Sequence, residues 1–221
     1  MVWRAWRVTR RQGLAHCSFG LLALLSSGLT LAQGINRQQI VVVGDSLSAE
    51  YGLAAGTGWV ALLQDKLKAQ KLPHQVRNAS ISGDTTAGGR SRLPALLRDV
   101  KPGIVIIELG GNDALRGLPL KSTRENLLAM TEAAQATGAK VLIVGMQVPP
   151  NYGPSYGREF AGLFAEVAQA RKAALVPFLL AGVADRADAM EWFQPDRIHP
   201  LAKAHPVMLE TVWQGLKPLL K

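Results

Sequence analysis

The sequence predicts an α/β fold in which helices cover both faces of a parallel β-sheet. Short apolar runs rich in β-branched residues alternate along the chain with longer segments whose apolar residues recur at helical spacing. Polar loops that contain glycine follow the first three apolar runs. The chain has 221 residues, 48% of them hydrophobic, so it can bury one substantial core. We therefore expect a single domain after an N-terminal leader.

The first strand is predicted at 40–43, where Ile-Val-Val-Val runs into Gly44 and then into Asp45, Ser46 and Ser48. Ligands and chemistry gather at the carboxyl ends of the strands in an open α/β sheet, so Ser46 is well placed to act as a nucleophile. A serine after a strand can equally be the N-cap of the next helix. This stretch alone leaves both interpretations open.

Helices and strands alternate through the rest of the chain. The apolar spacing predicts helices at 58–70, 89–98, 154–172 and 203–216, and short apolar runs predict strands at 75–79, 104–109, 141–144 and 175–179. Ser122 and Glu125 form a capping-box pattern, which predicts that a further helix begins there and extends to about residue 136. Pro177 favours an edge position for the last strand, because proline cannot donate to a neighbouring strand.

The loops after the first three strands carry a possible set of hydrogen-bond donors. Right-handed crossovers place these loops along one edge of the sheet, so Ser46, Gly83 and Asn112 should gather there. A serine nucleophile needs donors aimed at the oxyanion that its attack creates. The backbone N–H groups of Ser46 and Gly83 and the Asn112 amide are candidates, and the missing Cβ of Gly83 would allow a close approach of substrate. Gly83 and Asn112 could also be ordinary turn residues.

A candidate base lies near the C-terminus. In the segment PDRIHP, Asp196 stands three residues before His199, between two prolines and just before the last predicted helix. One short loop could bring the imidazole to Ser46 and the carboxylate to the other ring nitrogen. The alternative is a surface histidine beside a turn aspartate. His74 and His205 have no comparable acidic neighbour, and we interpret them as surface or packing residues.

Residues 1–32 are typical of a signal peptide, with four arginines and no acidic residue before an apolar run at 19–31. We expect cleavage before Gln33, a mature domain at 33–221 and a periplasmic or secreted location. The apolar run is short for a transmembrane span, although an uncleaved anchor is the alternative. Cleavage would also remove Cys17, the sole cysteine, and so exclude disulfides and thiol chemistry from the mature chain.

Charge and histidine content exclude further classes of function. The net charge is +9 for the whole chain, and without the leader 21 Lys and Arg stand against 16 Asp and Glu, a balance of +5. Basic residues do not form runs interleaved with aromatics, so we expect no nucleic-acid partner. The chain has no HExxH pair and, once cleaved, no cysteine, so we expect no metal site.

With GDSLS, SGD, GGND and DRIH in this order, the chain resembles the SGNH branch of the GDSL hydrolases. The segments NASISGDT, RLPALL, ELGGND and PPNYG are similar to a group of multifunctional periplasmic bacterial thioesterases and lysophospholipases within this branch. The resemblance extends from Ile40 to the C-terminus. It implies a flavodoxin-like three-layer α/β/α sandwich with a five-stranded parallel sheet.

The resemblance also implies a role for each motif residue. Ser46 would be the nucleophile and one oxyanion donor, with Gly83 and Asn112 as the other donors. His199 would be the general base, and Asp196 would orient its ring. Arylesterase, acyl-CoA thioesterase and lysophospholipase activities are implied, through an acyl-enzyme that water releases without metal or organic cofactor.

Substrates would be small acyl esters, thioesters or lysophospholipids, and the mature enzyme would be a monomer without a stable membrane anchor. The segment Leu115, Arg116, Gly117, Leu118 and Pro119 matches a substrate-binding loop that flanks the acyl chain and moves on binding. We interpret Asp45 and Asp113 as positioning residues that hydrogen-bond to loop backbone.

Three alternatives stay open at this point. One is a catalytically idle acyl-binding protein, which the presence of Ser46, Asp196 and His199 together disfavours. A carbohydrate O-deacetylase could use the same scaffold, and it would differ by having no use for a long apolar groove. A flavodoxin-like protein could instead bind a phosphate-bearing cofactor after the first strand. The GDSLS turn is unlike the Ser/Thr/Gly-rich cradle that such a cofactor needs.

Overall fold

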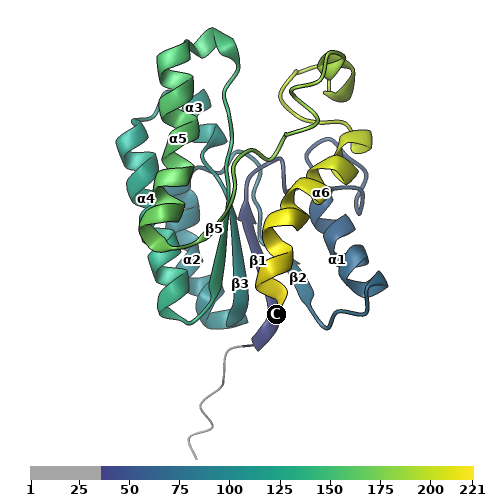
Figure 1. Ribbon diagram of the computed structural model, residues 1–221, viewed down its shortest axis with the longest axis vertical. Coiled ribbons are helices and arrows are strands. Elements are labelled where there is room, and N and C mark those ends of the chain that lie inside the picture. The colour runs from purple at the N-terminus through teal and green to yellow at the C-terminus, as the bar shows by residue number, and fades with distance from the viewer. Residues whose placement is uncertain (1–35) are drawn as a thin grey trace, which may run out of the picture. The chain divides into compact units, whose positions relative to one another are not determined.

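The structure, a computed structural model, describes residues 36–221, and the predicted signal peptide and its cleavage site lie outside them. The described residues contain a five-stranded parallel sheet in the order β2-β1-β3-β4-β5 (Figure 1). This confirms the predicted parallel sheet. Its strands are β1 (Asn36–Gly44), β2 (Gln75–Asn78), β3 (Pro102–Glu108), β4 (Lys140–Val144) and β5 (Ala174–Val176).

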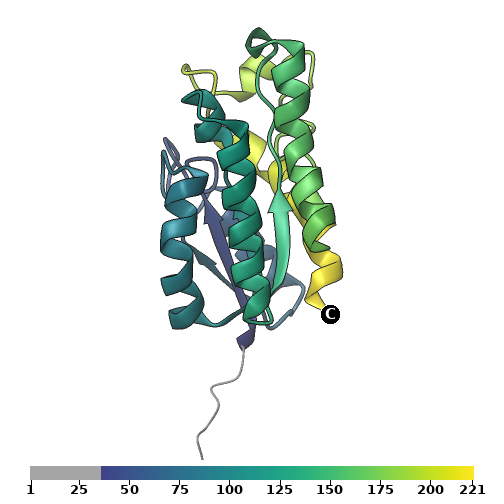
Figure 2. The ribbon, with the colours of Figure 1, turned by 90° about the vertical axis from the view of Figure 1, so that its left-hand side faces the viewer.

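Helices cover both faces of the sheet, as the sequence predicts. The helices α1 (Trp59–Ala69) and α6 (His205–Leu216) lie on one face (Figure 1). On the other face, α2 (Thr86–Val100), α4 (Leu120–Ala136) and α5 (Pro154–Arg171) lie side by side (Figure 2). A short helix, α3 (Gly111–Leu115), follows β3, and the 3₁₀ turns are η1 (Pro150–Tyr152), η2 (Ala189–Trp192), η3 (Ala202–Ala204) and η4 (Lys217–Leu220).

The alternation of side chains along the strands divides the core into two layers. Ile40 and Val42 of β1 pack with the α1 and α6 side, whereas Val41 and Val43 pack with the α2, α4 and α5 side. All four are fully buried. A central parallel strand buried on both faces must be apolar throughout, which explains the uninterrupted run in the sequence.

The strand order places the site. Beginning at β1, the chain moves outward to β2, returns across β1 to β3, and then continues outward to β5. The direction of winding therefore reverses between β1 and β3. In doubly wound sheets a crevice opens outside the carboxyl ends of the strands at this reversal. Ser46 follows β1 and Asn112 follows β3, so both lie at this position.

Several element boundaries differ from prediction, including the start of β1, which lies at Asn36 instead of residue 40. The prediction that Ser122 and Glu125 form a capping box at the start of a helix is wrong. Helix α4 begins at Leu120, after Pro119, and the Ser122 N–H donates to the Pro119 carbonyl within the first turn. Helix α2 begins at Thr86 instead of residue 89, because the Thr85 side chain accepts from the Gly88 N–H and caps the helix earlier. Strand β5 is the predicted edge strand but stops before Pro177, which has no N–H to donate.

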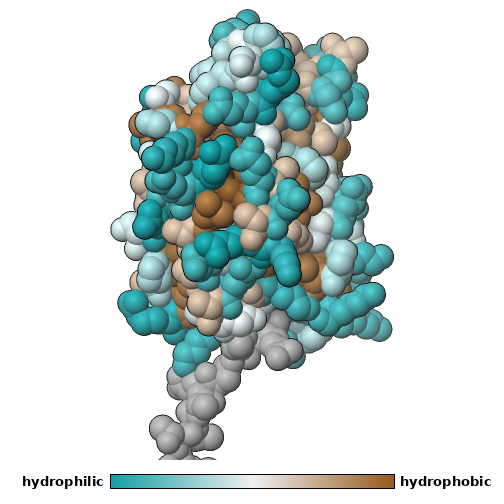
Figure 3. Space-filling model, turned by 60° about the vertical axis from the view of Figure 1, so that its left-hand side comes forward, coloured by the Kyte–Doolittle hydropathy of each residue, from teal (hydrophilic) through white to brown (hydrophobic). Residues whose placement is uncertain are grey.

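The face in Figure 3 is mostly hydrophilic, with small apolar areas between polar side chains. Scattered apolar groups of this kind are normal on folded proteins. Among residues 36–221, no helix has the length and apolar character needed to cross a membrane.

Candidate active site

Three predicted residues from opposite ends of the chain form a continuous hydrogen-bonded series. The Ser46 hydroxyl oxygen lies 2.8 Å from His199 Nε2, and His199 Nδ1 lies 2.6 Å from Asp196 Oδ2. His199 lies 153 positions after Ser46 in the sequence. The arrangement matches the serine, histidine and acid geometry in which each group acts on the next.

The turn after β1 sets the position of Ser46. The backbone N–H groups of Ser48 and Ala49 donate to the Asp45 carbonyl at 3.2 and 2.9 Å, which curls the chain immediately after the strand. The Asp45 side chain accepts from the Leu47 N–H at 3.0 Å. Ser46 therefore lies directly after a buried strand, on a turn that hydrogen bonds from the Asp45 backbone and side chain to the following residues hold in place.

Asp196 organises the loop that carries His199. Its Oδ1 accepts the backbone N–H groups of Ile198 and His199, both at 3.0 Å, while Oδ2 faces the His199 ring. Arg197 between them takes a left-handed φ of 59°. Burial acts to raise the pKa of Asp196, but the His199 and Ile198 backbone hydrogen bonds and the contact with the His199 ring outweigh it and lower that pKa to about 2. The carboxylate is therefore ionised throughout the neutral range.

Two further residues, which the sequence does not signal, support His199. The Tyr51 ring packs against the imidazole, with centroids 4.3 Å apart and planes inclined by 37°. Gln194 joins the two loops: its backbone N–H donates to the His199 carbonyl at 2.7 Å, and its side-chain amide donates to the Tyr51 carbonyl at 2.9 Å. Gly52 is needed at this junction, because a Cβ there would lie 2.2 Å from Gln194 Oε1.

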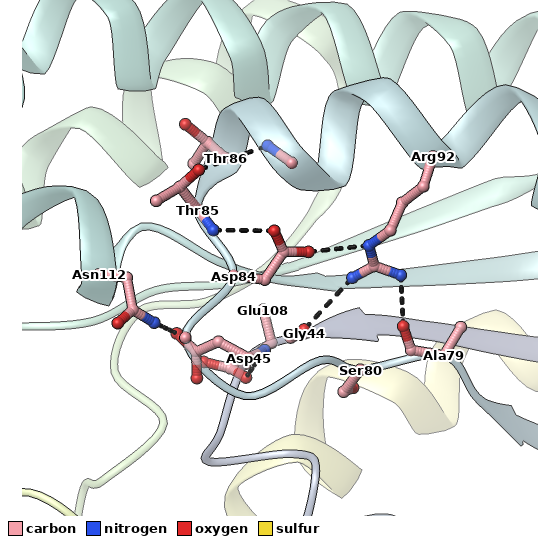
Figure 4. Close-up of polar contacts among 12 residues, drawn as sticks. Gly44, Asp45, Ala79, Ser80, Asp84, Thr85, Thr86, Arg92, Glu108 and Asn112 are labelled. Atoms are coloured by element: carbon pink, nitrogen blue, oxygen red, sulfur yellow. Dashed lines mark hydrogen bonds and ion pairs between the residues drawn. The ribbon is translucent and has the colours of Figure 1, made fainter.

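The predicted oxyanion donors lie in loops that converge on the same turn. One N–H of the Asn112 amide donates to Asp45 Oδ2 at 3.0 Å, which leaves its second N–H available (Figure 4). Among the described residues, none accepts a hydrogen bond from the N–H of Ser46 or Gly83. Gly83 adopts a φ of +78°, which favours glycine. Glycine serves here through its backbone conformation, since an added Cβ would meet only Arg116 Nη2 at 3.5 Å.

Arg92 of α2 ties together the loops beneath these donors (Figure 4). Its guanidinium forms an ion pair with Asp84 at 2.8 Å and donates to the carbonyl oxygens of Ala79 and, at 3.3 Å, Gly44. Ala79 directly follows β2, Gly44 ends β1, and Asp84 directly follows Gly83. One planar side chain with several fixed donors thus sets the spacing of two strand ends and one loop.

The predicted substrate-binding segment, residues 115–119, connects α3 to α4. It turns at Gly117, whose φ is +64°, and the Leu118 N–H returns to the Asp113 carbonyl at 2.9 Å, closing a Schellman motif. The Arg116 guanidinium donates to the Gly83 carbonyl at 2.6 Å, which places the segment beside the candidate oxyanion donors. Leu115 and Leu118 are exposed.

Asp113 and His205 have structural partners. Asp113 is buried and accepts from the Thr86 backbone N–H at 2.9 Å and from the hydroxyls of Thr86 and Thr123. This agrees with its interpretation as a positioning residue. Buried His205 accepts from the Trp59 N–H at 3.0 Å and so caps α1, a role that the sequence does not reveal. Burial lowers the pKa of His205, consistent with a neutral acceptor.

A shallow depression beside Ser46 completes the site. It is lined by Ser46, Leu47, Tyr51, Leu53, His199, Pro200 and His205. Exposed apolar side chains stand on several loops at the same end of the sheet, namely Tyr51, Ile81, Leu115, Leu118 and Ile198. The site therefore combines a polar reactive centre with apolar surroundings.

Known proteins are similar over most of the chain. It is 52% identical to esterase TesA of Pseudomonas aeruginosa, across 90% of this chain and 99% of the relative. It is 36% identical to thioesterase 1/protease 1/lysophospholipase L1 of Escherichia coli K12, across 93% of each.

Solved structures show the same similarity. A crystal structure of TesA, 52% identical, superposes with a TM-score of 0.79 and covers 82% of this chain and 99% of its own. The psychrotrophic esterase EstA of Pseudoalteromonas, in a structure inhibited by monoethylphosphonate, is 39% identical with a TM-score of 0.77, covering 83% and 98%. The model of the GDSL-like Lipase/Acylhydrolase family matches residues 42–207. The chain belongs to this family.

Proposed function

We propose that the protein is a serine hydrolase that cleaves carboxylic esters and thioesters through an acyl-enzyme on Ser46. The observation that carries this proposal is the series from Ser46 through His199 to Asp196, with contacts of 2.8 and 2.6 Å. The names of the relatives, which are esterases and a thioesterase, support the reaction class.

In the first half of the reaction, His199 Nε2 takes the Ser46 hydroxyl proton as the oxygen attacks the substrate carbonyl carbon. The carbonyl oxygen becomes an oxyanion, which the N–H groups of Ser46 and Gly83 and the second N–H of Asn112 would stabilise. When the tetrahedral intermediate collapses, the imidazolium gives its proton to the leaving alcohol or thiol. Water then repeats the sequence on the acyl-enzyme and restores the Ser46 hydroxyl.

Asp196 supports both halves of the reaction. Its ionised carboxylate fixes the ring tautomer in which Nδ1 carries the proton, so Nε2 is free to accept one from Ser46. The same charge stabilises the imidazolium once it forms. The Tyr51 ring covers one side of His199 and limits its rotation.

We infer a small acyl substrate with an apolar chain, including lysophospholipids, as the name of the Escherichia coli relative suggests. Exposed Ile81, Leu115 and Leu118 offer apolar contacts near the site, and residues 115–119 would flank the chain and move on binding. The proposed steps use protein groups for every proton transfer and for the oxyanion, so the proposal includes no metal or organic cofactor. We also propose export to the periplasm or beyond, without a stable anchor, and a monomeric enzyme.

The test is hydrolysis of p-nitrophenyl esters from acetate to long acyl chains by the wild type and by Ser46→Ala. Ser91→Ala, an exposed serine of α2, is the matched control. We expect turnover to grow with chain length, to vanish in Ser46→Ala and to persist in Ser91→Ala. Activity confined to acetate would favour a carbohydrate O-deacetylase, and activity that survives in Ser46→Ala would show that another residue is the nucleophile.

A further inference from the structure

Two carboxyl groups lie next to each other beneath the turn that carries Ser46. Asp45 directly follows β1 and Glu108 ends β3, where the strand register pairs Gly44 with Glu108. Asp45 is 2% exposed and Glu108 is fully buried. Within residues 36–221, neither group forms an ion pair with a lysine or arginine. Two such carboxylates cannot both be ionised without a large energetic cost.

Hydrogen-bond donors are divided unequally between the two groups. Both oxygens of Asp45 accept, from the Leu47 N–H and from the Asn112 amide, each at 3.0 Å. Glu108 Oε2 accepts a short hydrogen bond from the Ser48 hydroxyl, at 2.6 Å, and a long one from the Asp45 N–H, at 3.4 Å. Glu108 Oε1 is buried and has no hydrogen-bond partner among the described residues. If one of the two carboxyl groups holds a proton, that proton therefore belongs on Glu108 and the negative charge on Asp45.

The electrostatics agree with this division. Burial raises the pKa of Asp45 to about 6, and the hydrogen bonds from Leu47 and Asn112 limit the rise. Burial raises the pKa of Glu108 well above its usual range, and the Asp45 charge raises it further. At neutral pH, Asp45 is ionised and Glu108 is a neutral acid.

The charge on Asp45 determines which way the Asn112 amide faces. An ionised carboxylate can only accept hydrogen bonds, so Asn112 must turn its NH₂ group toward Asp45 (Figure 4). One N–H is held by Asp45, and the other stays available to an oxyanion. A neutral side chain at position 45 could donate to Asn112 Oδ1 and stabilise the reversed amide.

We propose that Asp45, kept ionised beside a neutral Glu108, is the positioning residue that orients the Asn112 amide for the oxyanion. This inference rests on the proposed function, because it assigns Asn112 the role of oxyanion donor. It differs from a backbone-bracing role for Asp45, because the contact with Leu47 would brace the turn whichever way the amide of Asn112 faced.

Asp45 is surrounded by groups that affect its titration. His199, when protonated, lowers the pKa of Asp45, and Asp84 from the loop after β2 raises it. Arg92 of α2 is engaged with Asp84 and with the carbonyls of Gly44 and Ala79. Below a pH of about 6, Asp45 takes up a proton and no longer fixes Asn112. The acid limb of log kcat should therefore be steeper in the wild type than in a variant whose residue 45 cannot titrate.

The decisive experiment is a double-mutant cycle of the wild type, Asp45→Asn, Asn112→Ala and the double variant, with kcat and KM measured on one p-nitrophenyl ester. Asparagine at position 45 keeps an acceptor for Leu47 but presents NH₂ to Asn112, which opposes the required amide orientation. We expect Asn112→Ala to lower kcat roughly a hundredfold or more, as loss of one oxyanion donor does. Asp45→Asn should lower kcat at least about tenfold with little change in KM, and the double variant should be no worse than Asn112→Ala.

Glu108→Gln is the companion variant, since it replaces a neutral acid by a neutral amide of the same shape. We expect its kcat to stay within about threefold of the wild type and its acid limb to stay as steep as that of the wild type. The acid limb of log kcat should be less steep in Asp45→Asn. Thermal melting of each variant separates loss of fold from loss of orientation.

Several results would overturn the proposal. One is a kcat in Asp45→Asn equal to that of the wild type. Another is a double variant whose fold-loss in kcat equals the product of the two single losses. A third is a large loss of kcat in Glu108→Gln. If Asn112→Ala itself kept full activity while Ser46→Ala was inactive, the oxyanion role of Asn112 would fall together with this inference, whereas the nucleophile would stand. Activity that survived in Ser46→Ala would instead remove the proposed function.

Discussion

Gly44→Ala should lower both the stability and the kcat of the protein, because Gly44 packs directly beneath the turn that carries Ser46. Gly44 is the last residue of β1, and its φ lies outside the left-handed region, so alanine is allowed by the backbone. The obstacle is space. An added Cβ would lie 2.7 Å from Ser48 Oγ, 2.8 Å from Ser48 Cβ and 2.8 Å from Glu108 Oε2. Both neighbours are buried, so neither can move aside into solvent.

The cost has two parts. Overpacking of this kind costs about 1–3 kcal/mol. Separating Ser48 from Glu108 breaks a 2.6 Å hydrogen bond between buried groups, which costs about 1–3 kcal/mol more. Together these predict that the free energy of unfolding falls by about 2–6 kcal/mol, or roughly 4–24 °C in Tm for a domain of this size. The turn that carries Ser46 must shift as well, and a displacement near 1 Å can reduce kcat about a hundredfold.

Thermal unfolding followed by circular dichroism, together with kcat on one ester, would measure both effects. Gly162→Ala is the matched control, because Gly162 lies inside α5 and an added Cβ would meet nothing within 4 Å. That control should be stabilised by up to about 1 kcal/mol, since alanine favours the helix more than glycine does. A Gly44→Ala variant with the Tm and kcat of the wild type would refute the assigned packing of Ser48 and Glu108.

Three further predictions follow from the site. Asp196→Asn should lower kcat on the order of 10²–10⁴-fold with an unchanged circular dichroism spectrum, because the ring loses the partner that fixes its tautomer; a loss below threefold would argue against the role. His205→Ala should lower the free energy of unfolding in urea by about 1–3 kcal/mol, because Trp59 loses the acceptor that caps α1; an unchanged urea midpoint would contradict the cap. The folded-state pKa of Asp45, about 6, lies above its usual value of 3.8, so the native state binds more protons than the unfolded chain between these values. The wild type should therefore lose stability relative to Asp45→Asn as pH rises from about 4 to 6, and parallel curves for the two proteins would exclude the shift.

Much of the fold could be predicted from local pattern. The run of apolar residues in β1 reflects burial of the strand on both faces. The helical spacing of Phe160, Leu163 and Phe164 reflects burial of one face of α5. Pro177 predicted the edge strand because its missing N–H is a local property. Boundaries were less predictable, since α4 begins at Leu120, soon after the turn at Gly117 that follows α3, which the Ser122–Glu125 pattern does not reveal.

The site divides in the same way. Ser46, Asp196 and His199 stand in short motifs whose residue types suggest their chemistry, and strand order brings the motifs together. The residues that support His199 do not stand in a recognisable sequence motif. Tyr51 and Gln194 contribute through contacts between loops that are distant in sequence, and no local pattern encodes those contacts.

Glu108 shows most clearly what only the tertiary structure decides. Its presence in an apolar strand is visible in the sequence, but a carboxylate there could have paired with a cation or faced solvent. The fold instead buries it beside Asp45, with one oxygen unpartnered. The sequence by itself determined which chemical groups and secondary structures are present. Their protonation and orientation were decided by burial and by neighbouring charges, which exist only after the strands have been placed side by side.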